Sequence, residues 1–124
     1  MKNKYLVITS ILGAITILLG AFGAHALKEK LGVDALKSFE AGVRYQMYHI
    51  IVLLFVNTYV GFTSKTKKVL SLMFIAGIIL FSGSIYAITV LGVNPKSIWF
   101  ITPLGGLFFI LGWIKMAISF LKNS

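Results

Sequence analysis

The stretch YLVITSILGAITILLGAFGA, residues 5–24, contains no charged side chain. A helix needs about 20 predominantly apolar residues to cross the hydrocarbon core of a bilayer, and this run has that length. Cleaved signal peptides carry a shorter apolar core, of about 7–15 residues. Although Ala24-His25-Ala26 has the small-x-small pattern of a cleavage site, we therefore expect a retained membrane helix.

Three further apolar runs follow, at about residues 42–62, 69–91 and 98–121, in a chain that is 58% hydrophobic and 12% charged. Soluble domains are about one-quarter charged. Spanning segments must be helical, because lipid offers the backbone no hydrogen-bond partners, and short connections favour antiparallel neighbours. The sequence predicts an all-α polytopic membrane protein, with one domain over residues 1–124 and four transmembrane helices in an antiparallel bundle.

The connection between the first two runs is longer and holds all three acidic residues, Glu29, Asp34 and Glu40. Asp34 is a suitable N-cap for a helix that begins at Ala35, and Leu36 and Phe39 would share the apolar side of that helix. We therefore expect a short interfacial helix between the first and second membrane helices.

The formal net charge of the chain is +9. Strongly basic chains often bind nucleic acid, but here the lysines stand at the ends of apolar runs, which favours contact with the lipid bilayer over contact with nucleic acid. With an even number of spans both termini share one side. More basic residues fall on that side, so we predict a cell-membrane protein with cytoplasmic termini. The basic residues assigned to that side are Lys2, Lys4, Lys65, Lys67, Lys68, Lys115 and Lys122.

Small residues recur along the apolar runs at helical spacing. Membrane helices associate through close packing and polar contacts, and small residues permit the close approach. We accordingly expect Ser82 and Ser84 to donate hydrogen bonds between helices. The glycines predicted to lie at helix–helix contacts are Gly13, Gly20, Gly23, Gly83, Gly105 and Gly112.

Polar residues cluster at the end of the first run and the start of the second. We expect seven of them to gather near one membrane interface, with His49 deeper than the rest: His25, Glu40, Arg44, Tyr45, Gln46, Tyr48 and His49. Such a cluster is either a hydrogen-bonded lock or a functional site, because ionisable groups inside membranes often mark function. The functional alternatives are a proton or solute pathway through His49, haem ligation by His25 and His49, and catalysis.

The residue types that the chain contains limit which catalytic, metal and cofactor sites it can form. The chain has no cysteine, so thiolate metal sites and disulfides are excluded. It shows neither the His/Glu spacing of a zinc enzyme nor a nucleophile with an evident base. Haem ligation is disfavoured because His25 and His49 fall at different depths, and axial ligation needs both rings at one height. We predict no catalytic residue, no metal site and no cofactor.

Several blocks resemble an uncharacterised bacterial membrane family, catalogued as domain of unknown function 423 and similar to eukaryotic transmembrane protein 256. The blocks are GAFGAHALKEKL (20–31), FEAGVRYQMYH (39–49), GSIYAI (83–88), ITPLGG (101–106) and LGW (111–113). The resemblance implies a small multi-spanning membrane protein, and it supplies no reaction. It also implies that eight residues belong to recurring blocks: Gly20, Gly23, His25, Glu40, Arg44, Tyr45, Gln46 and His49.

Small size and packing glycines favour a non-enzymatic accessory or assembly component of a membrane complex, with a membrane-protein partner. The alternative is a small oligomeric transporter or channel that uses the polar cluster around His49. Four short helices enclose little volume, so a transporter of this size is expected to form a homo-oligomer.

Overall fold

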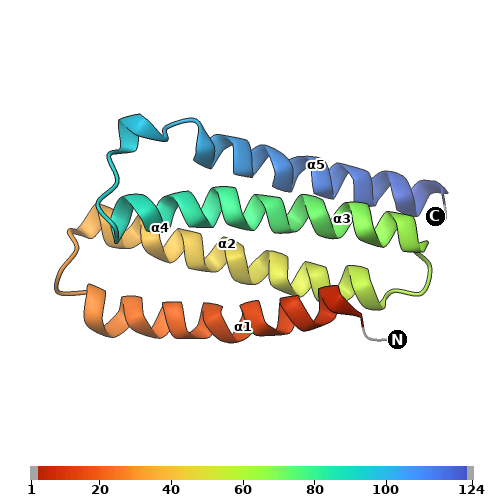
Figure 1. The fold of residues 1–124 in the computed structure, drawn as a ribbon, viewed down its shortest axis with the longest axis horizontal. Helices are drawn as coiled ribbons and strands as arrows, with labels where there is room; N and C mark the ends of the chain where they lie inside the picture. The colour runs from red at the N-terminus through yellow and green to blue at the C-terminus, as the bar shows by residue number, and fades with distance from the viewer. Residues whose placement is uncertain (1–2, 123–124) are drawn as a thin grey trace.

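A computed structural model describes residues 3–122, which form long helical rods laid side by side (Figure 1). The first rod is α1 (Lys4–Phe22), which continues without a break into a π-helical turn, η1 (Gly23–Leu27). The second is α2 (Val33–Thr58), a single helix of 26 residues. Asn3 caps α1, because its side chain accepts hydrogen bonds from the backbone N–H groups of Tyr5 and Leu6.

The third rod has three parts, and the fourth is continuous. Helix α3 (Ser64–Gly77) runs through a second π-helical turn, η2 (Ile78–Ser82), into α4 (Gly83–Thr89). A connection containing the short 3₁₀ turn η3 (Pro95–Ser97) then leads to α5 (Ile101–Lys122). No strand occurs in residues 3–122, and the predicted all-α class is confirmed.

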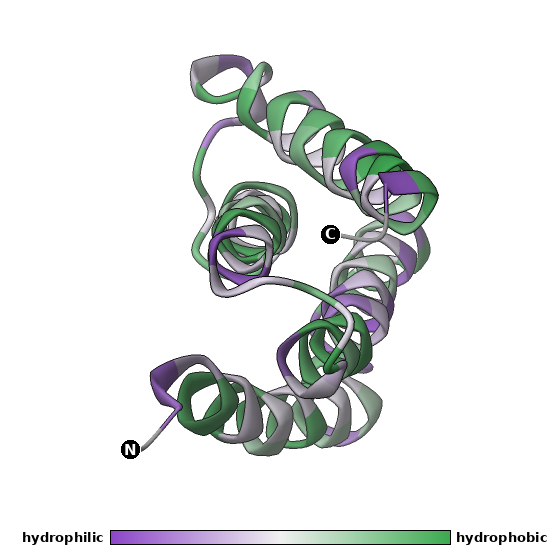
Figure 2. Ribbon diagram, turned by 90° about the vertical axis from the view of Figure 1, so that its right-hand side faces the viewer, coloured by the Kyte–Doolittle hydropathy of each residue, from purple (hydrophilic) through white to green (hydrophobic). Residues whose placement is uncertain are grey.

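The rods follow their chain order in space, with α1 and α5 at opposite edges (Figures 1 and 2). Helix α1 packs mainly against α2, while α2 also packs against α3, η2 and α4. Helix α5 packs mainly against α3 and η2. The described residues thus form an open, curved layer of antiparallel rods: α1 and α5 have no substantial contact with each other, while side chains of α2 also reach α5.

Three rods are long and apolar enough to cross a membrane: Lys4–Leu27, Ser64–Thr89 and Ile101–Lys122. Helix α2 is long enough but more polar, because charged residues stand along its first turns and Gln46, His49 and Asn57 follow further on. Apolar residues dominate the other three rods in Figure 2.

The structure corrects the prediction of a separate interfacial helix. Residues 35–41 are the first turns of α2 itself. Its N-cap is Gly32, which makes no side-chain cap, and Asp34 lies inside the first turn, where a carboxylate interacts favourably with the helix dipole. The helix does not break, because the buried positions Phe39, Gly42 and Gln46 continue one face at spacings of three and four.

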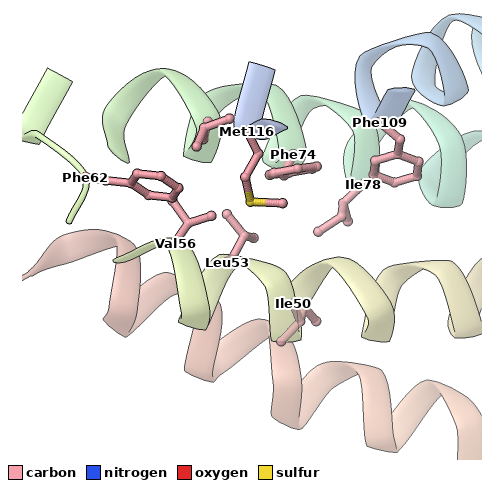
Figure 3. Packing of buried hydrophobic residues seen from close by; sticks show 9 residues of the cluster. Ile50, Leu53, Val56, Phe62, Phe74, Ile78, Phe109 and Met116 are labelled. Atoms are coloured by element: carbon pink, nitrogen blue, oxygen red, sulfur yellow. The ribbon is translucent and has the colours of Figure 1, made fainter. Parts of the chain in front are cut away.

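A hydrophobic core joins α2, α3 and α5 toward the end where the chain termini lie (Figures 1 and 3). Leu53, Val56, Leu70 and Phe74 are completely buried there. Large apolar side chains also cover the outer faces of the layer; Leu18 of α1 is 68% exposed and Leu121 of α5 is 83% exposed. Exposed apolar surface of this extent fits a lipid environment.

Three of the predicted packing glycines, Gly105, Gly112 and Gly23, allow helices or rings to approach closely. A Cβ at Gly105 would collide with the backbone of Phe81, and one at Gly112 would lie 2.7 Å from the Phe74 ring. A Cβ at Gly23 would lie 2.7 Å from the buried ring of Phe39, so these three positions require close approach.

The other predicted glycines are less constrained. At Gly13 and Gly20 an added Cβ would make ordinary contacts, at 3.8 Å and 3.7 Å, with side chains of α2. Gly83 has no neighbour within 4 Å of such a Cβ, so its prediction as a packing residue is wrong. Gly77 takes that role in the third rod instead, because a Cβ there would collide with the ring of Phe109.

Candidate functional site

Gln46 lies buried on the inner face of α2 and joins three helices through its side-chain amide. Its Nε2 donates to Oγ1 of Thr16 in α1 at 2.7 Å, and the Thr16 hydroxyl donates to the carbonyl of Leu12 at 2.6 Å. Its Oε1 accepts from the hydroxyl of Tyr86 in α4, also at 2.7 Å. A continuous hydrogen-bonded chain therefore crosses the layer from α4 through α2 to α1.

His49 lies one helical turn further along α2 and is only 4% exposed. Its Nδ1 lies 2.7 Å from the carbonyl oxygen of Tyr45, and its Nε2 lies 3.1 Å from Nε1 of Trp113 in α5. A carbonyl can only accept and an indole N–H can only donate. The network therefore assigns the proton to Nδ1 and the lone pair to Nε2, so both ring nitrogens of a neutral His49 are occupied.

Aromatic rings enclose His49 on the side of α3 and α5. The imidazole stacks on Phe109, with 3.7 Å between ring centroids and 5° between planes. Phe74 and Trp113 approach it at 5.5 Å and 6.1 Å between centroids. This arrangement depends on Gly77 and Gly112, since a methyl group at either position would displace Phe109 or Phe74.

The structure does not bring the seven predicted polar residues together. The side chains of Gln46 and His49 are buried, whereas the other five are exposed: His25, Glu40, Arg44, Tyr45 and Tyr48. Because α2 is one continuous helix, residues 40, 44 and 48 lie on the side opposite the buried stripe of 39, 42, 46 and 49. Glu40 and Arg44 form no ion pair within residues 3–122.

The hypothesis of haem ligation by His25 and His49 does not fit this geometry. Nε2 of His49 accepts from Trp113, and His25 is exposed in η1. Since Gly23 packs against Phe39, His25 lies about 12 residues above His49, or roughly 18 Å at 1.5 Å per residue. The two rings cannot reach opposite faces of one porphyrin.

Sequence reasoning missed the partners of the two buried residues: Thr16, Tyr86 and Trp113. Their only sequence signal is a polar group inside an apolar run, because polar side chains at such positions need a partner. The expectation that Ser82 and Ser84 donate hydrogen bonds between helices is confirmed for Ser82. Ser82 donates to the Gly42 carbonyl at 2.7 Å, and Ser84 is hydrogen-bonded to Thr102 of α5.

Two shallow grooves lie along α2. One, of about 300 Å³, lies between the first turns of α2 and the last turns of α4 and includes Asp34, Ser38 and Thr89. The other, of about 350 Å³, lies between α2 and α5 beside His49. No group of three or more histidine, aspartate or glutamate side chains in the described part of the chain is placed to hold a metal ion.

A family model described as "Protein of unknown function (DUF423)" matches residues 19–106. The chain belongs to this family. The matched region contains Gln46, His49 and Tyr86, and it leaves Thr16 and Trp113 outside. The family resemblance expected from the sequence blocks is therefore confirmed.

Relatives cover nearly the whole chain. A UPF0382 membrane protein of Haemophilus influenzae is 39% identical over 123 residues, covering 99% of this chain and 98% of the relative. UPF0382 membrane protein YwdK of Bacillus subtilis is 42% identical over 119 residues, covering 90% and 94%. UPF0382 inner membrane protein YgdD of Escherichia coli is 33% identical over 131 residues, covering 98% and 93%. No solved structure matches. This DUF423 chain is thus an integral membrane protein.

Proposed function

We propose that this DUF423 protein spans the cell membrane four times and acts as a non-enzymatic accessory or assembly component of a membrane complex. The observation that carries the proposal is that Gln46 and His49, two buried polar residues of α2, each have both hydrogen-bonding ends of the side chain paired within the fold. Gln46 uses both ends of its amide, and His49 uses both ring nitrogens. Groups that are fully paired within the fold serve to hold the helices together.

Helix α2 supplies the fourth span in this proposal. Its 26 residues extend about 39 Å at 1.5 Å per residue, more than the roughly 30 Å of a hydrocarbon core. It lies between α1 and the α3–η2–α4 rod, both of which qualify as spans. Its buried polar side chains bond to neighbouring helices rather than facing lipid: Gln46 to α1, Asn57 to α3 and His49 to α5.

Charge supports an orientation with the α2–α3 connection in the cytoplasm. That end of the layer carries Lys65, Lys67 and Lys68 together with both ends of the described chain, and no acidic residue. The three acidic residues lie at the opposite end, with fewer basic residues. Basic residues are retained preferentially on the cytoplasmic side.

The geometry around His49 favours the accessory role over the transporter alternative. A proton or solute pathway needs a titrating group that exchanges protons with a polar route. Nε2 of His49 instead accepts from Trp113, and the ring stacks on Phe109. Helix α1 also offers a lateral surface for a partner, because it packs mainly on α2 and exposes Val7, Ile11 and Leu18 on other sides.

Mild-detergent affinity purification from native membranes tests this function. We expect a heteromeric complex of fixed stoichiometry, with a partner whose abundance falls when this chain is deleted. A variant with the lateral surface enlarged, Ile11→Trp with Leu18→Trp, should reduce the recovered partner without changing the amount of inserted protein.

A matched control places the same substitution on the other edge of the layer, at Leu107 and Ile114, which are also exposed. Recovery of the chain alone, as a homo-oligomer of defined size with His49-dependent solute flux, would contradict the accessory role and favour the transporter.

A further inference from the structure

The groove between α2 and α5 has an unusual lining for a surface that faces hydrocarbon. Five of its seven lining residues carry rings: Tyr45, His49, Phe81, Phe109 and Trp113. Its volume of about 350 Å³ falls within the range of small-ligand sites, which begins near 300 Å³. Planar rings on several sides favour a planar guest, because aromatic groups gain from offset or edge-to-face contacts beyond the area they bury.

Gly106 leaves the space open. It lines the groove, and a Cβ added there would meet only the Phe81 ring, at 3.9 Å. The adjacent Gly105, in contrast, is required by the backbone of Phe81. Close helix packing therefore explains Gly105 and does not explain Gly106, whose missing side chain is what keeps the groove from being filled.

The groove contains one polar group without a partner. Tyr45 contacts Tyr48 and Phe81 edge-on, and within residues 3–122 its hydroxyl makes no hydrogen bond. His49 and Trp113 are already satisfied by each other. A hydroxyl in hydrocarbon without a hydrogen bond is costly, and an acyl chain has no acceptor at this depth to offer.

We propose that this groove binds a planar, membrane-dissolved ring molecule that carries a carbonyl acceptor, the chemistry of an isoprenoid quinone. The Tyr45 hydroxyl donates to the carbonyl, the ring lies among Phe81, Phe109 and Trp113, and the tail leaves the groove into the bilayer over Gly106. The inference rests on the proposed four-span topology, which places α2 and α5 in the hydrocarbon, and it goes beyond the proposed accessory role.

Tryptophan fluorescence provides a direct test. The chain has two tryptophans, and Trp99 is 71% exposed, so Trp99→Phe leaves Trp113 as the only reporter. This protein, in nanodiscs of phosphatidylethanolamine and phosphatidylglycerol, is titrated with decylubiquinone, whose ring quenches nearby indoles. We expect saturable quenching of Trp113, with decylbenzene, which has the tail and no oxygen, competing at least tenfold more weakly.

Three variants locate the site. Gly106→Leu fills the groove and should weaken quinone binding at least tenfold, whereas Gly83→Leu, at a glycine that faces open space, should leave binding unchanged. Tyr45→Phe removes one hydrogen bond and should weaken binding up to about tenfold. Tyr45→Phe keeps the ring, so it gives an answer even where Gly106→Leu fails to fold.

The opposing result is quenching that rises linearly with quinone and is the same in wild type, Gly106→Leu and Tyr45→Phe. Such partitioning would show that the groove holds acyl chains only, and it would overturn the proposal. Failure of the quinone proposal can be distinguished from failure of the proposed topology or of the accessory role. The topology is tested by labelling single introduced cysteines, and the accessory role is tested by co-purification.

Discussion

At the scale of single residues, the buried amide of Gln46 and the imidazole of His49 each meet two complementary partners. Thr16 and Tyr86 satisfy Gln46, while Trp113 and the Tyr45 carbonyl satisfy His49. Hydrogen bonds between membrane helices contribute on average about 0.6 kcal/mol and up to about 1.7 kcal/mol each. A partner left alone in a buried site adds a further cost.

Replacing Gln46 with alanine should destabilise the fold by about 1–3 kcal/mol. The substitution removes two hydrogen bonds and leaves the hydroxyl of Tyr86 without its acceptor. Reversible unfolding by SDS in mixed micelles measures the change. Tyr48→Ala is the matched control, because Tyr48 is half exposed on the other side of α2 and its loss should change stability by about 0.5 kcal/mol or less. Equal effects of the two substitutions would contradict the role of Gln46.

The tautomer of His49 is open to direct observation. Nitrogen-15 NMR of histidine-labelled protein should show two rings, because the chain has two histidines. We expect His49 to be neutral with its proton on Nδ1. In Trp113→Phe the Nε2 signal should move, because Nε2 loses its donor. An Nε2-protonated ring in the wild type would contradict the assigned hydrogen bonds.

At the scale of elements, close contact between α5 and the third rod depends on glycines. Their roles differ, although all of them lie within apolar runs. Gly105 and Gly112 each allow a helix or ring to approach α5, and Gly77 admits Phe109 from the other side. Gly83 lies in the same rod as Gly77 and has no neighbour. Spacing alone could not separate them, because the rotation of a helix depends on the partner it meets.

Alanine substitutions at Gly105 and Gly83 should have opposite effects. At Gly105 the added methyl collides with the backbone of Phe81, which cannot move aside as a side chain can. We expect a loss of about 2 kcal/mol or more, typical of overpacking. At Gly83 the methyl enters open space, and helix propensity should stabilise the protein by up to about 1 kcal/mol. Thermal unfolding in one detergent compares the two, and equal losses would refute the distinction.

At the scale of the whole molecule, the chain forms an open layer whose edge helices, α1 and α5, expose apolar side chains. Three rods qualify as spans by composition, and α2 is the polar one between them. The proposed four-span topology therefore depends on α2, and it places residues 32 and 97 on one side of the membrane and residue 64 on the other.

Single cysteines report this topology without interference, because the chain has none of its own. In intact cells a membrane-impermeant maleimide should label Gly32→Cys and Ser97→Cys, and should label Ser64→Cys only after permeabilisation. If α2 lay on the surface instead, Ser64→Cys and Ser97→Cys would exchange sides. Labelling of Ser64→Cys in intact cells would therefore overturn the fourth span.

The sequence is sufficient to predict the helical class, the family and Ser82 as the donor of an interhelical hydrogen bond, but not the acceptor, which is the Gly42 carbonyl. It also singled out Gln46 and His49, because polar groups inside apolar runs are conspicuous. The sequence does not separate them from Glu40, Arg44 and Tyr48. A separate interfacial helix was expected, so the buried positions that repeat along the whole of α2 were not treated as one face. The pairing of Trp113 with His49 joins residues 64 positions apart in the sequence, a separation that no local pattern encodes.

The π-helical turn η2 sets the rotation of α4 relative to α3 within the third rod. A wider turn holds one residue more than an α-helical turn, so it shifts the phase of everything beyond it by about 100°. Before it, Leu70 and Phe74 meet the hydrophobic core; at its last residue and beyond it, Ser82 and Tyr86 hydrogen-bond to α2. Removing the single exposed residue Ile79 would restore a regular helix and swing Tyr86 away from Gln46. The two halves of the rod thus present different faces to α2 in a phase set by one residue, so a one-residue deletion within 78–82 should disturb the fold more than a conservative substitution there.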